Sequence, residues 1–403
     1  MADIDAVDVW IGLDVGKESH YATVLDDQGD KLAARSVSNG EDDLEALINT
    51  SEKHGTPALV IDQPGSIAQL ALAVCKRRDI PVAYIPGLVM RRAADLYPGE
   101  AKTDPIDSFV IADTARTRRR QVHWLKPTDE ILEQLQVLNG FDLDLAADTT
   151  RITNRLRDCL TSISPALERA VGSRLSHAGV RALLAKYPTP TALRKAGRPK
   201  LAKLVKSRSP RLGDKVADAV IAALDAQSVV VSAEATIGRV IGELAGELDR
   251  LYDRRAALGK EIEEVFLSHP LGPVLVSLPG IGTRTGARIL AEIGDGSQFA
   301  SGAKLASYAG LAPVLRQSGT SIKGVSKSQR GNHRLKNALF LSAFAAFRSG
   351  ESKVFYDRKR AEGKRHNAAV ICLARRRCDV ILAMLRTGTH YVNPNAENLA
   401  KVA

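Results

Sequence analysis

Four aspartates stand where carboxylates from separate elements of a fold could meet around a divalent cation. Asp14 ends the run VDVWIGLDV, Asp62 ends the run PALVID, and Asp104 and Asp107 share one face at the head of a helical pattern. Bare carboxylates repel each other, but Mg²⁺ or Mn²⁺ takes carboxylate and phosphate oxygens together. Each aspartate alone also fits an ordinary role as a turn residue, a strand end or a helix N-cap. Their joint placement predicts a metal-dependent site that cuts or joins phosphodiesters.

The elements that would position these carboxylates alternate along the first 125 residues. VDVWIGLDV predicts a strand, and HYATVLDDQGDKLAARSV predicts two more strands around a turn at Gln28 and Gly29. Next come a helix over GEDDLEALINTSEKHG, a strand over PALVID, a helix over IAQLALAVCKRR, a strand over IPVAYIP and a helix over DPIDSFVIADTARTRRR. A three-stranded meander followed by helix-crossover strands indicates a mixed α/β sheet with helices packed on it.

Three motifs in this region resemble a known family. IGLDVGK, VIDQPGS and GEAKTDPIDSFVIAD are similar, in order and spacing, to the RNase H-fold, RuvC-like catalytic domain of DEDD transposases of the insertion-sequence 110 family. Further on, VSLPGIGTRTGARILAEIGD and FASGAKLASYAGLAPVLRQSGTSIKGVSKSQRGNHRLKNALF resemble that family's C-terminal transposase domain. The resemblance implies a DNA transposase or recombinase that cuts and rejoins the strands of an insertion sequence. The chain departs from the family at Asp62, where the second acidic residue is usually Glu.

The resemblance also implies a serine nucleophile in the motif RQSG. Ser318 would attack a phosphodiester and hold one DNA end as a phosphoserine while strands are exchanged. A serine hydroxyl is a weak nucleophile when free, so it needs metal or cationic help and a neighbouring base, for which Asp104 or Asp107 is the candidate. From the residues alone, Ser318 is one of several serines in a cationic loop whose small residues suit close approach to DNA.

Positive charge indicates a polyanionic partner. The 403 residues include 57 Lys and Arg against 46 Asp and Glu, a net charge of +11, which favours nucleic acid. Residues 171–215 hold twelve Lys or Arg against Asp214 alone, so this basic insert predicts salt-sensitive binding. A solvated helix end or basic face is the alternative for the cations. The candidate nucleic-acid contacts are Arg116, Arg118, Arg119, Arg120, Lys195, Arg198, Lys200, Lys203, Lys206, Gly280, Gly282, Lys323, Lys327, Arg330 and Arg334.

The segment LPGIGTRTGARIL predicts a helix-hairpin-helix. Gly280 and Gly282 allow a tight hairpin whose backbone N–H groups, beside the start of the next helix, can bind a phosphate without reading sequence. An ordinary glycine turn between two helices is the alternative.

Two heptad runs indicate coiled-coil arms in the middle of the chain. From residue 237 to residue 265 apolar positions alternate by four and three, and only Arg255 interrupts them. We expect Arg255 to lay its apolar stem along the seam and to keep its charge in water. An earlier run from 131 to 163 keeps the same register but contains Asp142 and Thr149. It fits an antiparallel partner or a second seam; the alternative is that each run packs within its own domain.

These patterns divide the chain into four parts. We expect a RuvC-like catalytic domain over 1–125, coiled-coil arms over 126–269 with a basic helical insert at about 171–230, a mainly α C-terminal domain over 270–391 and a tail over 392–403. The acidic N-terminus lacks a signal-peptide pattern, and no apolar run reaches the length of a membrane span, so we expect a cytoplasmic protein without a membrane partner.

The expected partners are DNA, as element ends and target, and further copies of the chain. A transposase must hold at least two DNA segments, which favours a homodimer or homotetramer. Some members of the family that the chain resembles are guided by a structured RNA encoded in the element. The resemblance therefore adds a guide RNA to the partners to be tested.

Three other functions stay open from the sequence. A RuvC-like hydrolytic nuclease would share the carboxylates but need no serine. An actin-like or sugar-kinase ATPase is suggested by GLDVGKES, although no second phosphate loop or Gly-rich adenosine segment accompanies that motif. A non-catalytic DNA-binding scaffold would use the hairpin, the insert and the arms, but it leaves the four aspartates unexplained.

Overall fold

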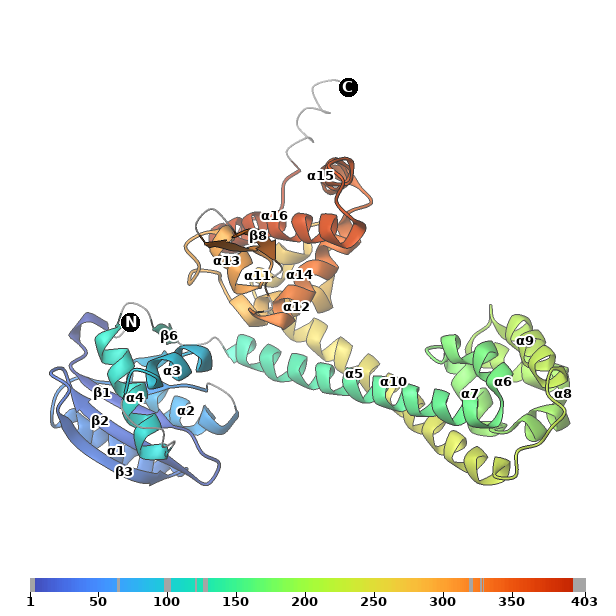
Figure 1. The fold of residues 1–403 in the computed structure, drawn as a ribbon, viewed down its shortest axis with the longest axis horizontal. Coiled ribbons are helices and arrows are strands. Elements are labelled where there is room, and N and C mark those ends of the chain that lie inside the picture. The colour runs from blue at the N-terminus through green and yellow to red at the C-terminus, as the bar shows by residue number, and fades with distance from the viewer. Residues whose placement is uncertain are drawn as a thin grey trace, which may run out of the picture. The chain divides into compact units, whose positions relative to one another are not determined.

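The computed structural model describes residues 4–63, 66–97, 103–119, 122–125, 130–318, 322–326, 328 and 330–393. The chain forms two compact units, Met1–Asp129 and Glu130–Ala403 (Figure 1). Within the described ranges, no helix combines the length and the apolar character needed to cross a bilayer.

The first unit is built on a six-stranded sheet in the order β3-β2-β1-β4-β5-β6. Its strands are β1 (Val9–Asp14), β2 (Ser19–Asp26), β3 (Lys31–Ser38), β4 (Pro57–Ile61), β5 (Val82–Tyr84) and β6 (His123–Leu125). The first three strands form the predicted antiparallel meander, and β4 and β5 run parallel to β1. The predicted mixed sheet is confirmed. The sequence pattern did not predict β6, a three-residue strand that pairs antiparallel to β5 at the edge.

Helices cover both faces of this sheet. They are α1 (Glu41–Glu52), α2 (Gln69–Arg77), α3 (Gly87–Ala94) and α4 (Asp104–Thr117). Val9, Ile11 and Leu13 of β1 share a core with α1 and α2, whereas Trp10 shares a second core with α3 and α4. This alternation follows from the period of two along a strand. The unit therefore has three layers, and α3 is a helix that the sequence pattern did not predict.

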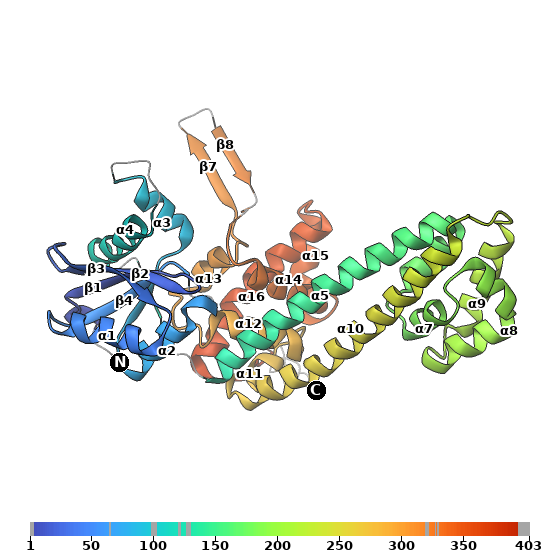
Figure 2. The ribbon, with the colours of Figure 1, turned by 90° about the horizontal axis from the view of Figure 1, so that it is seen from below.

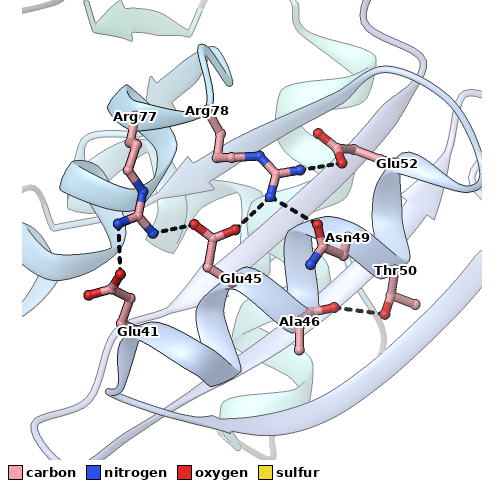
Figure 3. Close-up of polar contacts among 8 residues, drawn as sticks. All are labelled: Glu41, Glu45, Ala46, Asn49, Thr50, Glu52, Arg77 and Arg78. Atoms are coloured by element: carbon pink, nitrogen blue, oxygen red, sulfur yellow. Dashed lines mark hydrogen bonds and ion pairs between the residues drawn. The ribbon is translucent and has the colours of Figure 1, made fainter.

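A cluster of ion pairs joins α1 to the end of α2 (Figure 3). Arg77 donates hydrogen bonds to Glu41, at 2.7 Å, and to Glu45. Arg78 donates to Glu45 and Glu52, each at 2.6 Å. The hydrogen bond from Arg77, supported by Arg78, holds the pKa of the Glu45 carboxyl below its ordinary value. Because the cluster lies at the surface, water and salt screen it, and it contributes to helix docking less than the apolar core beneath it.

Helix α4 crosses β1 at Gly12 in direct backbone contact. A Cβ atom on Gly12 would lie 2.1 Å from the carbonyl oxygen of Ser108 and 2.6 Å from the backbone nitrogen of Ala112. The hydroxyl oxygens of Ser108 and Thr23 are 2.7 Å apart, and Thr23 is the β2 partner of Gly12. The crossing therefore fixes the position of α4 along β1.

The described part of the second unit contains helices and one two-stranded hairpin. The elements are α5 (Glu130–Ile163), α6 (Pro165–Val171), α7 (Ala178–Lys186), α8 (Pro190–Arg208), α9 (Gly213–Asp225), α10 (Glu234–Ser268), α11 (Leu271–Val276), α12 (Thr283–Ile293), α13 (Gly302–Tyr308), β7 (Val314–Ser318), β8 (Ile322–Ser326), α14 (His333–Ala346), α15 (Gly350–Ala361) and α16 (His366–Thr387). One apolar core runs through the unit from Leu135 to Leu385.

The long helices α5 and α10 pack against each other in opposite directions (Figures 1 and 2). The carbonyl oxygen of Ile163, at the end of α5, accepts a hydrogen bond from Gln227, which precedes α10. Asp142, near the start of α5, contacts Arg255 in the second half of α10. The buried faces carry the two apolar runs identified in the sequence. This pairing agrees with the antiparallel alternative, while supercoiled heptad packing stays a prediction.

The polar residues that interrupt the two runs meet each other. Arg255 Nε donates to Asp142 Oδ1 at 3.0 Å, and Arg288 of α12 donates to Asp142 Oδ2 at 2.7 Å. Burial raises the pKa of Asp142, but the hydrogen bonds and charges of the two arginines outweigh it and hold that pKa below its ordinary value. The expectation that Arg255 keeps its charge in water is wrong, because the buried carboxylate opposite it requires a cation.

Replacing Gly12 by Ala should destabilise the first unit by about 2 kcal/mol, because the new methyl group must displace the α4 backbone. Both tryptophans of the chain, Trp10 and Trp124, lie in this unit with ring centroids 6.1 Å apart. Unfolding in urea, followed by tryptophan fluorescence, therefore reports on this unit. Gly87→Ala is the control, because nothing lies within 4 Å of a Cβ atom there. Equal midpoints for the two variants would contradict the tight crossing.

Replacing Asp142 by Asn should cost the second unit about 2 kcal/mol at neutral pH, because two arginines lose a charged acceptor. The folded-state pKa lies below the unfolded value of about 3.9. The carboxylate therefore stabilises the fold above that pH, and this contribution is lost as the pH falls through the folded pKa. Denaturation followed by circular dichroism at several pH values measures the difference from wild type. The control is Asp148→Asn, which removes a more exposed partner of Arg151. A difference that grows on acidification would refute the assignment.

Candidate functional site

Asp14 and Asp62 lie at the ends of adjacent parallel strands. Leu13 of β1 pairs in register with Ile61 of β4, so each aspartate occupies the next position along its chain. Strand alternation places both on the face of the sheet that α3 and α4 cover. Both side chains are half-buried. The register of β1 and β4 therefore puts Asp14 and Asp62 at neighbouring strand ends, and their joint binding of a metal ion stays a prediction.

Helix α4 brings its first turn to the same end of the sheet. Ser108 lies over Gly12, and the last turn of α4 contacts the β2–β3 turn beside the start of β1. The helix therefore runs opposite to β1, and its first turn lies toward the end of β1 that carries Asp14. Asp104 and Asp107 stand in that first turn, where Asp104 is exposed and Asp107 is half-buried.

The four carboxylates provide the type of ligand atom that a hard divalent cation needs, because Mg²⁺ and Mn²⁺ prefer oxygen ligands. In the part of the chain that the structure describes, however, no three Asp, Glu, His or Cys side chains lie close enough together to hold a metal ion as they stand. The fold thus gathers the elements that carry the carboxylates without completing a ligand cluster. Charge repulsion between carboxylates favours their separation, which a bound cation would reverse.

The arginines at the C-terminal end of α4 either form bonds within the unit or face solvent. Arg116 pairs with Asp113 at 2.6 Å and donates to a backbone carbonyl of the β2–β3 turn. Arg119 donates to backbone carbonyls near the N-terminus. Arg118 is exposed, and Arg120 lies outside the described residues. Of these four candidates, Arg118 is the described side chain that faces solvent, where it is accessible to a phosphate.

The predicted glycine hairpin joins α11 to α12. Gly280 has a φ of +88°, and a Cβ atom there would lie 2.5 Å from the carbonyl oxygen of Ser342, so only glycine fits without strain. The buried Arg377 donates to the carbonyl oxygen of Pro279 at 2.7 Å and to the Ser342 hydroxyl at 2.9 Å. Burial lowers the pKa of Arg377 to about 10, so it stays charged at neutral pH. Gly282 is the N-cap of α12. Phosphate binding by this turn, and its identity as a helix-hairpin-helix, stay predictions.

The basic insert forms α7, α8 and α9. Gly197, with a φ of +73°, interrupts α8. Arg198 pairs with Asp218 at 2.6 Å, and Lys206 pairs with Asp214 at 2.6 Å. These two candidates therefore have their charges partly compensated. The exposed candidates for which the described residues supply no acidic partner are Lys195, Lys200 and Lys203.

A cavity of about 370 Å³ lies between α7, α8 and α10 and gathers further cations. Arg181 and Arg208 pair with Asp249 at 2.8 Å and 2.6 Å, and Lys186 and Arg250 also line the cavity. Burial raises the pKa of Asp249, but the two paired arginines outweigh it and lower that pKa. Sequence reasoning missed the contribution of Arg250, because no local pattern links α10 to the insert.

The segment around Ser318 is a hairpin, whereas the sequence predicted a loop. Strands β7 and β8 pair antiparallel and extend from the helices of their unit (Figure 2). Ser318 is the last residue of β7 and pairs with Ile322, the first residue of β8. Its side chain lies outside the part that the structure describes. The β-branched residues Val314, Ile322 and Val325 favour strands, but the intervening cations and small residues obscured that pattern.

The cations expected near Ser318 are only partly described. Lys323 lies in β8, but its side chain is outside the described part, and Lys327 is outside the described residues. Arg330 and Arg334 follow the hairpin and are exposed. Arg334 lines a cavity of about 210 Å³ together with Glu292 of α12.

The first unit has the sheet order and edge carboxylates of an RNase H-like α/β domain, a class that processes nucleic acids. Comparison with family models is more specific: residues 11–165 match a DEDD transposase model of the IS110 type, and residues 272–359 match the transposase IS116/IS110/IS902 family. The chain belongs to the IS110 family of transposases, which confirms the family predicted from the motifs.

Two relatives from insertion elements align with nearly the whole chain. The chain is 48% identical over 393 residues to an insertion element IS110 protein of Streptomyces coelicolor, covering 97% of each chain. It is 38% identical to an insertion element IS900 protein of Mycobacterium paratuberculosis, covering 95% of this chain and 97% of that one. A pilin gene-inverting protein of Moraxella bovis is 40% identical over 116 residues, which are 28% of this chain and 36% of that protein. The protein is thus an enzyme of the transposase and DNA recombinase class.

Replacing Lys195, Lys200 and Lys203 by Gln together should weaken nucleic-acid binding and flatten its salt dependence. Each lost phosphate contact lowers the slope of log affinity against log salt by about 0.9, so three contacts lower it by about 2 to 3. Fluorescence anisotropy over a salt series measures the slope. The control, called the arm control, is Arg155→Gln, Arg239→Gln and Lys260→Gln on α5 and α10, which are also exposed. Equal slopes for wild type and the lysine triple would leave these lysines as a solvated face.

Proposed function

We propose that this transposase cuts and rejoins the DNA strands of an insertion sequence with a metal-carboxylate site and Ser318 as nucleophile. The observation that carries the proposal is that the first turn of α4 lies toward the end of the sheet where the central strands β1 and β4 end. Those three elements carry Asp14, Asp62, Asp104 and Asp107.

The four aspartates are the proposed ligands of Mg²⁺ or Mn²⁺. When bound, such a cation neutralises charge on the scissile phosphate and polarises its oxygens. Asp62 takes the place where the family usually has Glu, and its position directly after β4 supports a ligand role. The side chains of Asp14, Asp62 and Asp107 are half-buried, which limits the rotations available to them and favours a defined geometry.

Ser318 is the proposed nucleophile. Its hydroxyl oxygen forms a bond to phosphorus while the bond from phosphorus to the bridging oxygen of the leaving strand breaks. The serine proton passes to a carboxylate base, and the leaving oxygen takes up a proton. The phosphoserine ester conserves the energy of the broken bond, so attack by a strand hydroxyl can rejoin DNA and release the serine. The place of Ser318 at the end of β7 supports this role, and Arg330 and Arg334 supply positive charge after the hairpin.

The finer division of the chain and its partners belong to the same proposal. The RuvC-like domain carries the carboxylates, α5 and α10 act as coiled-coil arms, the insert binds nucleic acid and the C-terminal domain carries the serine and the glycine hairpin. DNA is the substrate, both as element ends and as target. Two DNA segments require two or more copies of the chain, as a homodimer or homotetramer. A guide RNA would be held by the same phosphate chemistry as DNA.

Replacing Asp104 by Asn should reduce strand cleavage about 100-fold or more while DNA binding is preserved, because a neutral amide is a much poorer ligand for a hard cation. Asp62→Glu should retain more activity than Asp62→Asn, because it keeps the charge. Cleavage of a labelled duplex with Mg²⁺, with Mn²⁺ and with EDTA measures both effects. Asp43→Asn, an exposed change on α1, is the control. Full cleavage by Asp104→Asn in EDTA would exclude the metal site.

Replacing Ser318 by Ala should abolish a covalent protein–DNA adduct and recombination while binding is retained. A nicked substrate traps the adduct, denaturing electrophoresis detects it, and mass spectrometry locates the modified residue. Ser328→Ala is the control, because it removes a nearby hydroxyl and should leave the adduct intact. A hydrolytic nuclease would give free ends and no adduct. Recombination without any adduct, or an adduct that persists in Ser318→Ala, would refute the serine step.

A further inference from the structure

Helix α15 buries none of its twelve residues. Aromatic contacts hold it to its unit: the rings of Phe347 and Tyr356 are 4.8 Å apart, and the Tyr356 hydroxyl lies 2.7 Å from Nδ1 of His366. A helix gains most of its stability in a protein from burying an apolar face. In α15 the apolar contacts come from Phe355 and Tyr356, which are only partly buried against the core of the unit, and most of the helix's residues are exposed.

The outer surface of α15 is strongly basic. Residues 348–376 contain nine Lys and Arg against three Asp and Glu. Two of the cations are paired, Lys353 with Asp357 and Lys359 with Glu362. The exposed cations that form no salt bridge with a described residue are Arg348, Arg358, Arg360, Lys364, Arg365, Arg375 and Arg376, although the charges of Arg358 and Lys364 also act on Glu362. We call residues 348–376 the α15 surface; none of its cations was among the candidates from the sequence.

Aromatic rings hold several of these cations in place. Arg358 and Arg376 lie over the ring of Phe355, at 5.0 Å and 5.1 Å from its centroid, and Arg348 lies over Phe347 at 5.3 Å. Such stacking restricts a long side chain, so less freedom is lost when it binds a phosphate. The same stacking occupies the rings. Binding of single strands relies on aromatic faces that stack on bases, and these faces already carry cations.

We propose that the α15 surface binds the phosphate backbone of duplex DNA, separately from the basic insert. An exposed α-helix fits the major groove of B-form DNA, whereas the major groove of duplex RNA is too deep and narrow to admit one. The inference rests on the proposed function, because an enzyme that joins two DNA segments needs more than one DNA-binding surface. The surface and the insert lie on different helices of the second unit, so each can be altered alone.

The test variant is Lys364→Gln, Arg365→Gln and Arg375→Gln in the full chain. These three side chains are exposed, and the stacked Arg358 and Arg376 stay unchanged. Affinity for a duplex DNA of random sequence is measured by anisotropy over a salt series in EDTA, so that no cleavage contributes. The slope against log salt should fall by about 2 to 3. The arm control removes the same charge and should keep the wild-type slope. Parallel titrations use duplex RNA and single-stranded DNA, for which the variant should change the slope less.

The alternatives give different results. A similar loss of slope in the arm control would show that the net charge of the protein, and not the α15 surface, sets the salt dependence. A larger change for duplex RNA than for duplex DNA would show that RNA is the ligand of this surface. A change in the mass of the assembly by light scattering, with unaltered DNA binding, would assign the surface to contacts between copies of the chain. Each of these would overturn the proposal. The variant should still cleave DNA at saturating DNA concentration. Because affinity is measured in EDTA, where cleavage does not contribute, the outcome of this test does not depend on whether the metal site or the serine is assigned correctly.

Discussion

The backbone contact between α4 and β1 at Gly12 determines where the first unit can carry chemistry. Because position 12 has no side chain, α4 lies directly on the strand, and the Ser108–Thr23 hydrogen bond fixes its position along it. The direction of α4 then carries its first turn, with Asp104, to the edge where β1 and β4 end. The carboxylates thus depend on a position that has no functional group of its own. A bulkier residue at position 12 would change the alignment of the carboxylates without touching any of them.

A buried charge organises the second unit in a comparable way. Asp142 on α5 accepts hydrogen bonds from Arg255 on α10 and Arg288 on α12, so one carboxylate connects three helices. Leaving such a carboxylate unpaired would cost several kcal/mol, about 3 to 5 by analogy with other buried pairs. This cost penalises other registers of α5 against α10, which an apolar seam alone would tolerate. The polar interruptions of the two heptad runs are therefore part of the packing.

The positive charge of the chain serves two different purposes. Arg116, Arg119, Arg181 and Arg377 donate to carboxylates or backbone carbonyls inside their own units and hold the fold. Other cations, on α8 and on the α15 surface, face solvent. A high net charge destabilises a compact state through self-repulsion. Exposed clusters are therefore best explained by a polyanion that binds them, whereas the four arginines bonded within their own units need no partner outside the chain.

The sequence by itself determined the local elements and the family. Period-two runs gave the strands of the meander, helix signals placed α4 with Asp104 and Asp107 in its first turn, and heptad spacing marked α5 and α10. These signals are short in range, so one chain is enough to read them. The tertiary structure decided which residues contact each other: Arg255 pairs with Asp142, and Arg377 donates to the glycine hairpin. It also decided that Arg116, in the last turn of α4, and Arg119, just after it, hold the fold, and that Ser318 ends a strand. Such contacts join residues far apart in the sequence, such as Arg255 with Asp142 and Arg377 with Pro279, which are 113 and 98 positions apart, or they depend on neighbouring strands. No local periodicity encodes them. The same reason explains why the α15 surface was missed: its charges were visible in the sequence, but their exposure and their aromatic supports follow only from how α14, α15 and α16 pack.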